Sequence, residues 1–118
     1  MGERVVNPQA VEELNSKIAT EKEALISGFA NIYRTGNVRC LKIGGTNNSS
    51  VLLTISAKDR PQENMAFIGR YYDGTKYYPL MVVINIANGT VNGYYFNGST
   101  NVEIDNNKSV QITCTYVV

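Results

Sequence analysis

The sequence predicts a mainly β protein: an antiparallel β-sandwich or jelly-roll-like head preceded by one short N-terminal α-helix. Its 118 residues suit a single domain with a core of its own. The 14 Asn and 10 Gly favour tight turns and therefore many short strands. Hydrophobic residues follow a helical spacing up to Gly28 and a spacing of two after it. We therefore expect a helix within residues 1–28 and a β-sandwich head over residues 29–118.

The segment from about Asn7 to Gly28 has helix signals at both ends. Asn7 suits an N-cap, Pro8 suits the first turn, and Gly28 is a natural C-terminal stop. Four apolar residues follow the spacing of a heptad seam, interrupted by Glu21: Val11, Leu14, Ile18 and Leu25. So narrow a stripe must pack either on the sheet of its own chain or on copies of the same helix. The narrowness favours copies, and the segment is predicted to be an oligomerisation stalk.

After Gly28, short runs with a period of two are separated by turn residues. The predicted strands cover residues 38–43, 51–56, 65–72, 75–78, 80–87, 92–96, 100–104 and 110–116. Asp73-Gly74, Asn88-Gly89 and Asn97-Gly98 are predicted hairpin turns. The run over 80–87 is apolar on both faces, which predicts a central strand covered on each side. In the last strand, every second residue from Val110 to Tyr116 is expected to face the core.

Charge and residue types exclude several classes of function. A net charge of +1 provides no basic face of the kind that binds nucleic acid. The chain has no His, so the commonest general base and metal ligand are missing. Asp59 and Glu63 share a loop, and nothing places them across a cleft as paired catalytic carboxylates. Asp73, Glu103 and Asp105 lack the spacing of a calcium loop. We expect no enzyme activity, no metal and no cofactor.

The cysteines and the first residues bear on the compartment. Cys40 and Cys114 lie in two predicted strands and are interpreted as small apolar residues, while a disulfide would require those strands to be neighbours. Without a CxxC pair, a zinc site is not expected.

The first ten residues lack the apolar stretch of a signal peptide. The longest aliphatic run, Leu80 to Ile84, is too short to cross a bilayer, so membrane insertion is not expected.

Three tyrosine pairs are the candidate binding residues. Neighbouring residues of a strand point to opposite faces, so each pair is expected to place one Tyr in the core and one outside. Tyr rings beside Asn and Asp combine flat apolar area with hydrogen-bonding tips, which suits binding of sugars or proteins. The candidates are Tyr71, Tyr72, Asp73, Tyr77, Tyr78, Tyr94, Tyr95 and Asn97. The alternative is ordinary cross-strand aromatic pairing that only stabilises a hairpin.

Basic residues are more frequent in the head than acidic ones. They are scattered over several predicted strands and loops, so we interpret them as parts of a solvated surface. Attraction to anionic polymers of a cell surface is the alternative.

The helical segment Val11-Glu12-Glu13-Leu14-Asn15-Ser16-Lys17-Ile18, followed by Tyr33-Arg34-Thr35-Gly36-Asn37-Val38, resembles the C-terminal ends of bacteriophage tail-fibre and baseplate proteins. The similar proteins come from phages and prophages of Gram-positive gut bacteria. In them a coiled coil ends where a small β-rich head begins. The resemblance implies a homotrimeric, virion-associated head, made in the host cytoplasm, that adheres to a polysaccharide or protein of the bacterial surface. No catalytic or binding residue can be carried over from it.

Two functional hypotheses follow, in different classes. The first is a non-enzymatic receptor-binding domain that is trimeric through the heptad seam and binds through outward Tyr, Asn and Asp side chains. The second is a structural or interaction subunit of a phage tail or other assembly, in which a partner buries the Tyr surface. A fragment of a carbohydrate-active enzyme is a third interpretation, which would require turnover of a glycan.

Overall fold

The computed structural model describes residues 19–47, 49–104 and 107–118, and within them it forms an antiparallel β-sheet protein. The nine strands are β1 (Glu21–Ile26), β2 (Ala30–Thr35), β3 (Val38–Thr46), β4 (Val51–Thr54), β5 (Met65–Tyr72), β6 (Tyr77–Ile84), β7 (Thr90–Phe96), β8 (Asn101–Glu103) and β9 (Ser109–Val117). One turn of 3₁₀-helix, η1 (Ala57–Asp59), follows β4. The mainly β, antiparallel class predicted from the sequence is confirmed.

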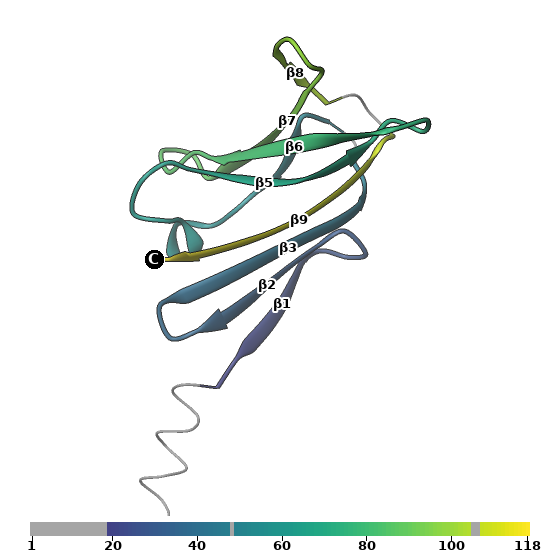
Figure 1. Cartoon of the computed structure of the whole chain (residues 1–118). Coiled ribbons are helices and arrows are strands. Elements are labelled where there is room, and N and C mark those ends of the chain that lie inside the picture. The colour runs from purple at the N-terminus through teal and green to yellow at the C-terminus, as the bar shows by residue number, and fades with distance from the viewer. Residues whose placement is uncertain (1–18, 48, 105–106) are drawn as a thin grey trace, which may run out of the picture.

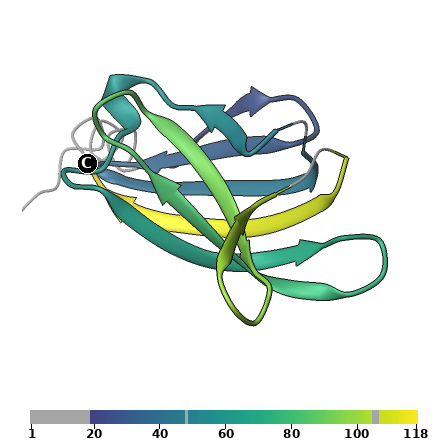
Figure 2. The ribbon, with the colours of Figure 1, turned by 90° about the horizontal axis from the view of Figure 1, so that it is seen from above.

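A single hydrogen-bonded sheet bends into two facing layers (Figure 1). Its order is β1-β2-β3-β9-β5-β6-β7-β4, with β8 beside β7. β3 and β9 pair along their full length, whereas β5 pairs with β9 only from Arg70 to Tyr72. Beyond this junction β5 leaves β9, so that β1-β2-β3-β9 form one layer and β5-β6-β7-β4 form the other. The view from above shows strands of the second layer crossing those of the first at an angle (Figure 2).

Gly69 allows β5 to approach β9 so closely at this junction. A Cβ atom at this position would lie 2.6 Å from Cβ of Ile112 and closer still to the backbone oxygen of Gln111. Real side chains do not tolerate such distances to backbone, so only glycine fits at the point where the sheet bends.

The core lies between the two layers. Val110, Ile112, Cys114 and Tyr116 of β9 are buried, as the alternation in the last predicted strand indicates. In β6, Leu80, Val82 and Ile84 are fully buried, but Met81 and Val83 on the outer face are only half-buried. The prediction that this strand is covered on both sides is therefore correct for its inner face only.

The predicted helix is wrong where the structure describes it, because Glu21–Ile26 form β1 and pair with β2. No α-helix occurs in the three described ranges. Leu25, assigned to the heptad seam, instead packs against the core. Residues 21, 23 and 25 share the inner face of β1, a period of two that the seam spacing concealed. The sheet therefore includes residues from Glu21 onward, and the boundary placed between residues 28 and 29 falls inside a β-hairpin.

The other three seam residues, Val11, Leu14 and Ile18, lie outside the described residues.

Strand β2 was not predicted at all. The segment from Tyr33 to Val38, on which the resemblance partly rests, forms the end of β2, a turn and the start of β3.

Two arginines interpreted as surface residues are buried. Arg34 of β2 and Arg39 of β3 both donate hydrogen bonds to the carboxylate of Asp59 in η1, each Nε lying 2.8 Å from Oδ1. Arg34 also donates to Glu23 at 2.6 Å. The hydroxyl of Tyr116 donates to the backbone oxygen of Asp59 at 2.6 Å. This buried network fastens the loop between β4 and β5 to the first layer.

The arginines decide the charge of the Asp59 carboxyl. Hydrogen bonds from Arg34, and then from Arg39, outweigh the cost of burial and lower the pKa of Asp59 from 3.8 to about 2. The same contact with Asp59, and the one with Glu23, raise the pKa of Arg34. Asp59 and Arg34 therefore stay charged at neutral pH.

Cys40 and Cys114 are both free thiols, in agreement with their interpretation as small apolar residues. They lie on neighbouring strands, but Cys114 is opposite Leu41, and Cys40 is opposite Thr115. Their side chains therefore point to opposite faces of the sheet. Burial raises the pKa of Cys114 to about 12, which keeps it a neutral, apolar thiol.

Candidate ligand-binding surface

The candidate tyrosines lie at one end of the second layer. In the register of β5 and β6, Tyr71 is opposite Tyr78 and Tyr72 is opposite Tyr77. Both pairs flank the tight turn at Asp73-Gly74. Because alternate residues face alternate sides, the structure separates these four rings into an inner group, which Tyr95 of β7 joins, and an outer group.

The inner group is Tyr71, Tyr78 and Tyr95. The rings of Tyr71 and Tyr95 stack with centroids 4.7 Å apart, and Tyr78 lies 5.0 Å from Tyr95. Tyr71 is only 1% exposed and belongs to the core, whereas Tyr78 and Tyr95 are half-buried. This cluster extends the core toward the end of the layer and leaves Tyr71 no surface for a ligand.

The outer group is Tyr72 and Tyr77, whose ring centroids lie 4.6 Å apart. Tyr77 is 61% exposed. The guanidinium of Arg70 lies 5.1 Å from the centre of the Tyr77 ring, within the range of a cation–π contact. The hydroxyl of Tyr72 donates to the backbone oxygen of Gly74 at 3.0 Å. Arg70, Tyr72 and Tyr77, which we call the aromatic ledge, are thus held in place without a ligand.

Asp73 and Asn97 shape turns with their side chains. Oδ1 of Asp73 accepts hydrogen bonds from the backbone N–H groups of Thr75 and Lys76, at 2.7 and 2.9 Å. The N–H groups of Lys76 and Thr75 lower the pKa of the Asp73 carboxyl. Oδ1 of Asn97 accepts from the backbone of Ser99 and Thr100, both at 2.9 Å. These oxygens are engaged in the local turn, as is usual for Asp and Asn at such positions.

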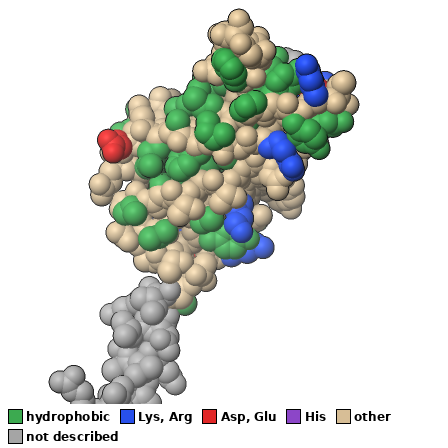
Figure 3. Space-filling view, in the orientation of Figure 1, with side chains coloured by type: hydrophobic (Ala, Val, Ile, Leu, Met, Phe, Trp, Pro, Cys, Tyr) green, Lys and Arg blue, Asp and Glu red, His purple; other side chains and the backbone are tan. Residues whose placement is uncertain are grey.

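The aromatic ledge continues into an exposed apolar surface on the outside of β5, β6 and β7. Neighbouring outward residues lie in register across these strands, as in the row Ile68–Met81–Tyr94. Ile68 is 70% exposed and Phe96 is 45% exposed. We call this surface the apolar face: Ile68, Pro79, Met81, Val83, Tyr94 and Phe96. In Figure 3, hydrophobic side chains follow β5 and β6 across the molecule.

Sequence reasoning missed the apolar face, although a signal for it exists. The run Met65-Ala66-Phe67-Ile68 is apolar at both alternate positions, so one of its two faces had to be exposed or covered by a partner. Tyr94, singled out as a candidate, belongs to this face rather than to the aromatic ledge.

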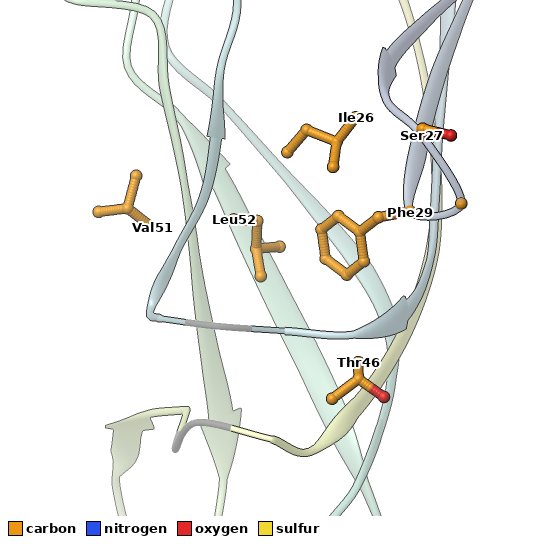
Figure 4. A pocket seen from close by; sticks show the side chains of 7 residues that line it. Ile26, Ser27, Phe29, Thr46, Val51 and Leu52 are labelled. Atoms are coloured by element: carbon orange, nitrogen blue, oxygen red, sulfur yellow. The ribbon is translucent and has the colours of Figure 1, made fainter.

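A separate hollow of about 400 Å³ lies between the β1–β2 turn and β4 (Figure 4). The side chains of Ile26, Phe29 and Leu52 converge in it. These residues come from near the two edges of the sheet, where the layers approach each other. Its lining combines apolar side chains with polar ones, Ser27 and Thr46, and none of the sequence-predicted site residues that the structure describes contributes to it.

Neither a cluster of metal ligands nor a membrane-spanning helix occurs in the described parts of the chain. No group of three or more Cys, Asp and Glu side chains there could hold a metal ion. No helix in those parts has the length and apolar character needed to span a bilayer. No protein-family model and no curated protein matches the sequence.

Proposed function

We propose that this chain is a non-enzymatic adhesion domain of a phage tail fibre or tail tip, which binds a glycan or protein of the bacterial surface as a homotrimer. The resemblance in sequence suggests the setting. The observation that carries the binding role is the aromatic ledge, where Tyr77 is exposed and is flanked by Tyr72 and Arg70.

The ledge has the physical properties of a binding surface. An exposed Tyr ring buries much apolar area when a ligand covers it, and its hydroxyl remains available for hydrogen bonds. The contacts with Tyr72 and Arg70 restrict the Tyr77 ring before binding, which reduces the entropy lost on association. Arg70 adds a fixed positive charge with several N–H donors.

The apolar face supports self-association. Contiguous apolar surface of this kind is uncommon on soluble monomers and usually marks a contact with another chain. Copies of one chain associate with closed symmetry, and a three-fold arrangement would bring equivalent faces together around an axis. Leu25, which the sequence analysis assigned to the oligomer interface, packs against the core of its own chain. In this proposal the apolar face therefore forms the interface between copies instead.

The apolar face also favours a second candidate function. In a structural or interaction subunit, a different protein of the assembly would cover this face, and the chain would not bind cells by itself. The two functions differ in whether the purified chain adheres to bacteria.

We expect the fluorescently labelled chain to bind cells of at least one species in a panel of Gram-positive gut bacteria. In the double variant Tyr72→Ala/Tyr77→Ala, binding should fall about tenfold or more, because truncating clustered aromatic anchors removes most of the energy of a small interface. Flow cytometry over a range of chain concentrations gives the apparent affinity.

Val38→Ala serves as the matched control, because Val38 is 38% exposed and lies on a different hairpin. It should bind as the unmodified chain does. Full binding by the Tyr double variant would rule out the ledge, and no binding to any cell by the unmodified chain would favour the structural function.

A further inference from the structure

The outside of the first layer differs chemically from the apolar face. Its outward side chains on β2, β3 and β9 are mostly hydroxyls and amides, among them Asn31, Gln111, Thr113 and Thr115. On β1, Glu21 and Glu23 are in register with inward-facing residues of β2 and so lie on the inner face. As far as the structure describes β1, β2, β3 and β9, none of their outward side chains is acidic.

Two hollows on this side join into one groove. A hollow of about 470 Å³ is lined by Asn31, Lys42, Gly44, Gln111 and Thr113, together with Phe29. A shallower depression of about 350 Å³ is lined by Gln111 and Thr113 again, and by Ile68, Gly69 and Arg70 of β5. Because the two hollows share residues of β9, the groove crosses β2, β3, β9 and the start of the second layer.

Glycine produces the depression. In the sheet register, Gly44 stands opposite Gln111, which in turn stands opposite Arg70. A Cβ atom added to Gly44 would have nothing within 4 Å, so the space above this residue is open. The neighbouring side chains of Lys42, Asn31 and Gln111 line the depression.

A positive charge lies toward each end of the groove. Lys42 extends over the ring of Tyr33, with Nζ 5.2 Å from its centre. Arg70 donates a hydrogen bond to Oε1 of Gln111 and also contacts Tyr77. The backbones at Lys42 and Arg70 are separated by two interstrand steps and by two residues along the strands, about 12 Å in all. Among the residues that the structure describes, no acidic side chain lines either hollow.

We propose that this groove binds an acidic polysaccharide, a chain of sugars that carries carboxylate or phosphate groups. The two cations would take anionic groups on successive parts of the chain, because their separation exceeds the width of one sugar ring. The amides of Asn31 and Gln111 and the hydroxyl of Thr113 would form hydrogen bonds with sugar hydroxyls. Net positive charge and hydrogen-bonding groups in one depression favour this ligand over a neutral sugar.

This site goes beyond the proposed adhesion through the aromatic ledge. Arg70 belongs to both surfaces, whereas Lys42 and Gly44 belong only to the groove. Variants of these two residues therefore test the groove separately from the ledge.

The test is a calorimetric titration of the full chain with tetragalacturonate and, in parallel, with phosphorylated maltotetraose. We expect one or both to bind, and the tighter one to identify the anionic group. Fully methyl-esterified tetragalacturonate, which has the same sugars without charge, should bind about tenfold more weakly or not at all.

Two variants locate the site. Gly44→Val should abolish binding by filling the depression while leaving the fold intact, because the space is open and a strand accommodates Val well. Lys42→Gln should weaken binding about tenfold. Lys58→Gln removes the same charge from η1, away from the groove, and should bind as the unmodified chain does.

Three results would overturn the proposal: no binding of either acidic oligosaccharide, equal binding of the methyl ester, or full binding by a folded Gly44→Val variant. A single-stranded oligodeoxynucleotide of equal charge that binds as tightly would reduce the groove to a general anion surface and would also contradict it. The variant Tyr72→Ala/Tyr77→Ala should keep its affinity for the acidic sugar, so failure of the ledge and failure of the groove give different results.

Discussion

Replacing Asp59 by Ala is expected to lower the free energy of unfolding by about 3–5 kcal/mol, because it leaves buried guanidinium groups without their carboxylate. Within the described part of the chain, Arg39 would retain only the backbone oxygens of Gly36 and Val38 as partners. Arg34 would retain Glu23, whose side chain is half exposed. Urea denaturation followed by circular dichroism measures the change. Lys58→Ala, its neighbour in η1 and exposed, should alter the unfolding free energy by less than about 0.5 kcal/mol.

The same network makes stability depend on acid. Since the folded-state pKa of Asp59 is lowered from 3.8 to about 2, its contribution is complete above pH 3.8 and is lost as the pH falls toward 2. Asp59→Asn should therefore lose less stability than the unmodified chain over that interval. Equal losses in both proteins, or an Asp59→Ala variant as stable as the Lys58→Ala control, would show that the network contributes little.

Replacing Gly69 by Ala is expected to destabilise the fold by about 3 kcal/mol or more, because a methyl group cannot fit between β5 and the backbone of β9. The junction at Gly69 is where the single sheet bends into two layers, so the strands would have to separate there. Thermal unfolding followed by circular dichroism provides the measurement.

Gly44→Ala is the matched control for this substitution, because Gly44 also lies in a strand and has open space around its Cβ position. We expect it to remain within about 1 kcal/mol of the unmodified chain or to be more stable. Similar effects of the two substitutions would contradict the role given to the Gly69 junction.

The strands that the sequence predicts well are those with clear turns and one buried face. The turns predicted at Asp73-Gly74 and Asn97-Gly98 connect β5 with β6 and β7 with β8. Strand β5 begins and ends at the predicted residues. In β9, polar residues alternate with apolar ones, so its inner face was evident. Both signals are local, which is why a single sequence was sufficient.

The N-terminal part could not be predicted in the same way. Glu23 lies on the inner face of β1, where its carboxylate accepts a hydrogen bond from Arg34. A charged residue on the inner face interrupts the alternation of apolar and polar residues on which strand prediction depends. Likewise, Arg34 and Arg39 are buried only because Asp59, distant in sequence, meets both of them. Such long-range charge pairs leave no local pattern.

The candidate binding site was predicted in part. The sequence correctly predicted that the two tyrosine pairs at the Asp73-Gly74 turn divide between an inner and an outer face, since β-strand alternation is simple geometry. It did not show which member of the first pair lies in the core, namely Tyr71, or that Asp73 and Asn97 are engaged by their own turns. The groove over Gly44 depends on which strands become neighbours, and β3 and β9 are far apart in the chain.

The most direct test of this account is the solution mass of the purified chain, measured by light scattering coupled to size exclusion over a range of concentrations. We expect about three times the 13.0 kDa of one chain, because self-association would cover the apolar face. Ile68→Lys should reduce the mass to that of a monomer, since it places a charge within this face, whereas Val38→Lys, on another hairpin, should not. A chain that remains monomeric at every concentration would contradict the proposed homotrimer.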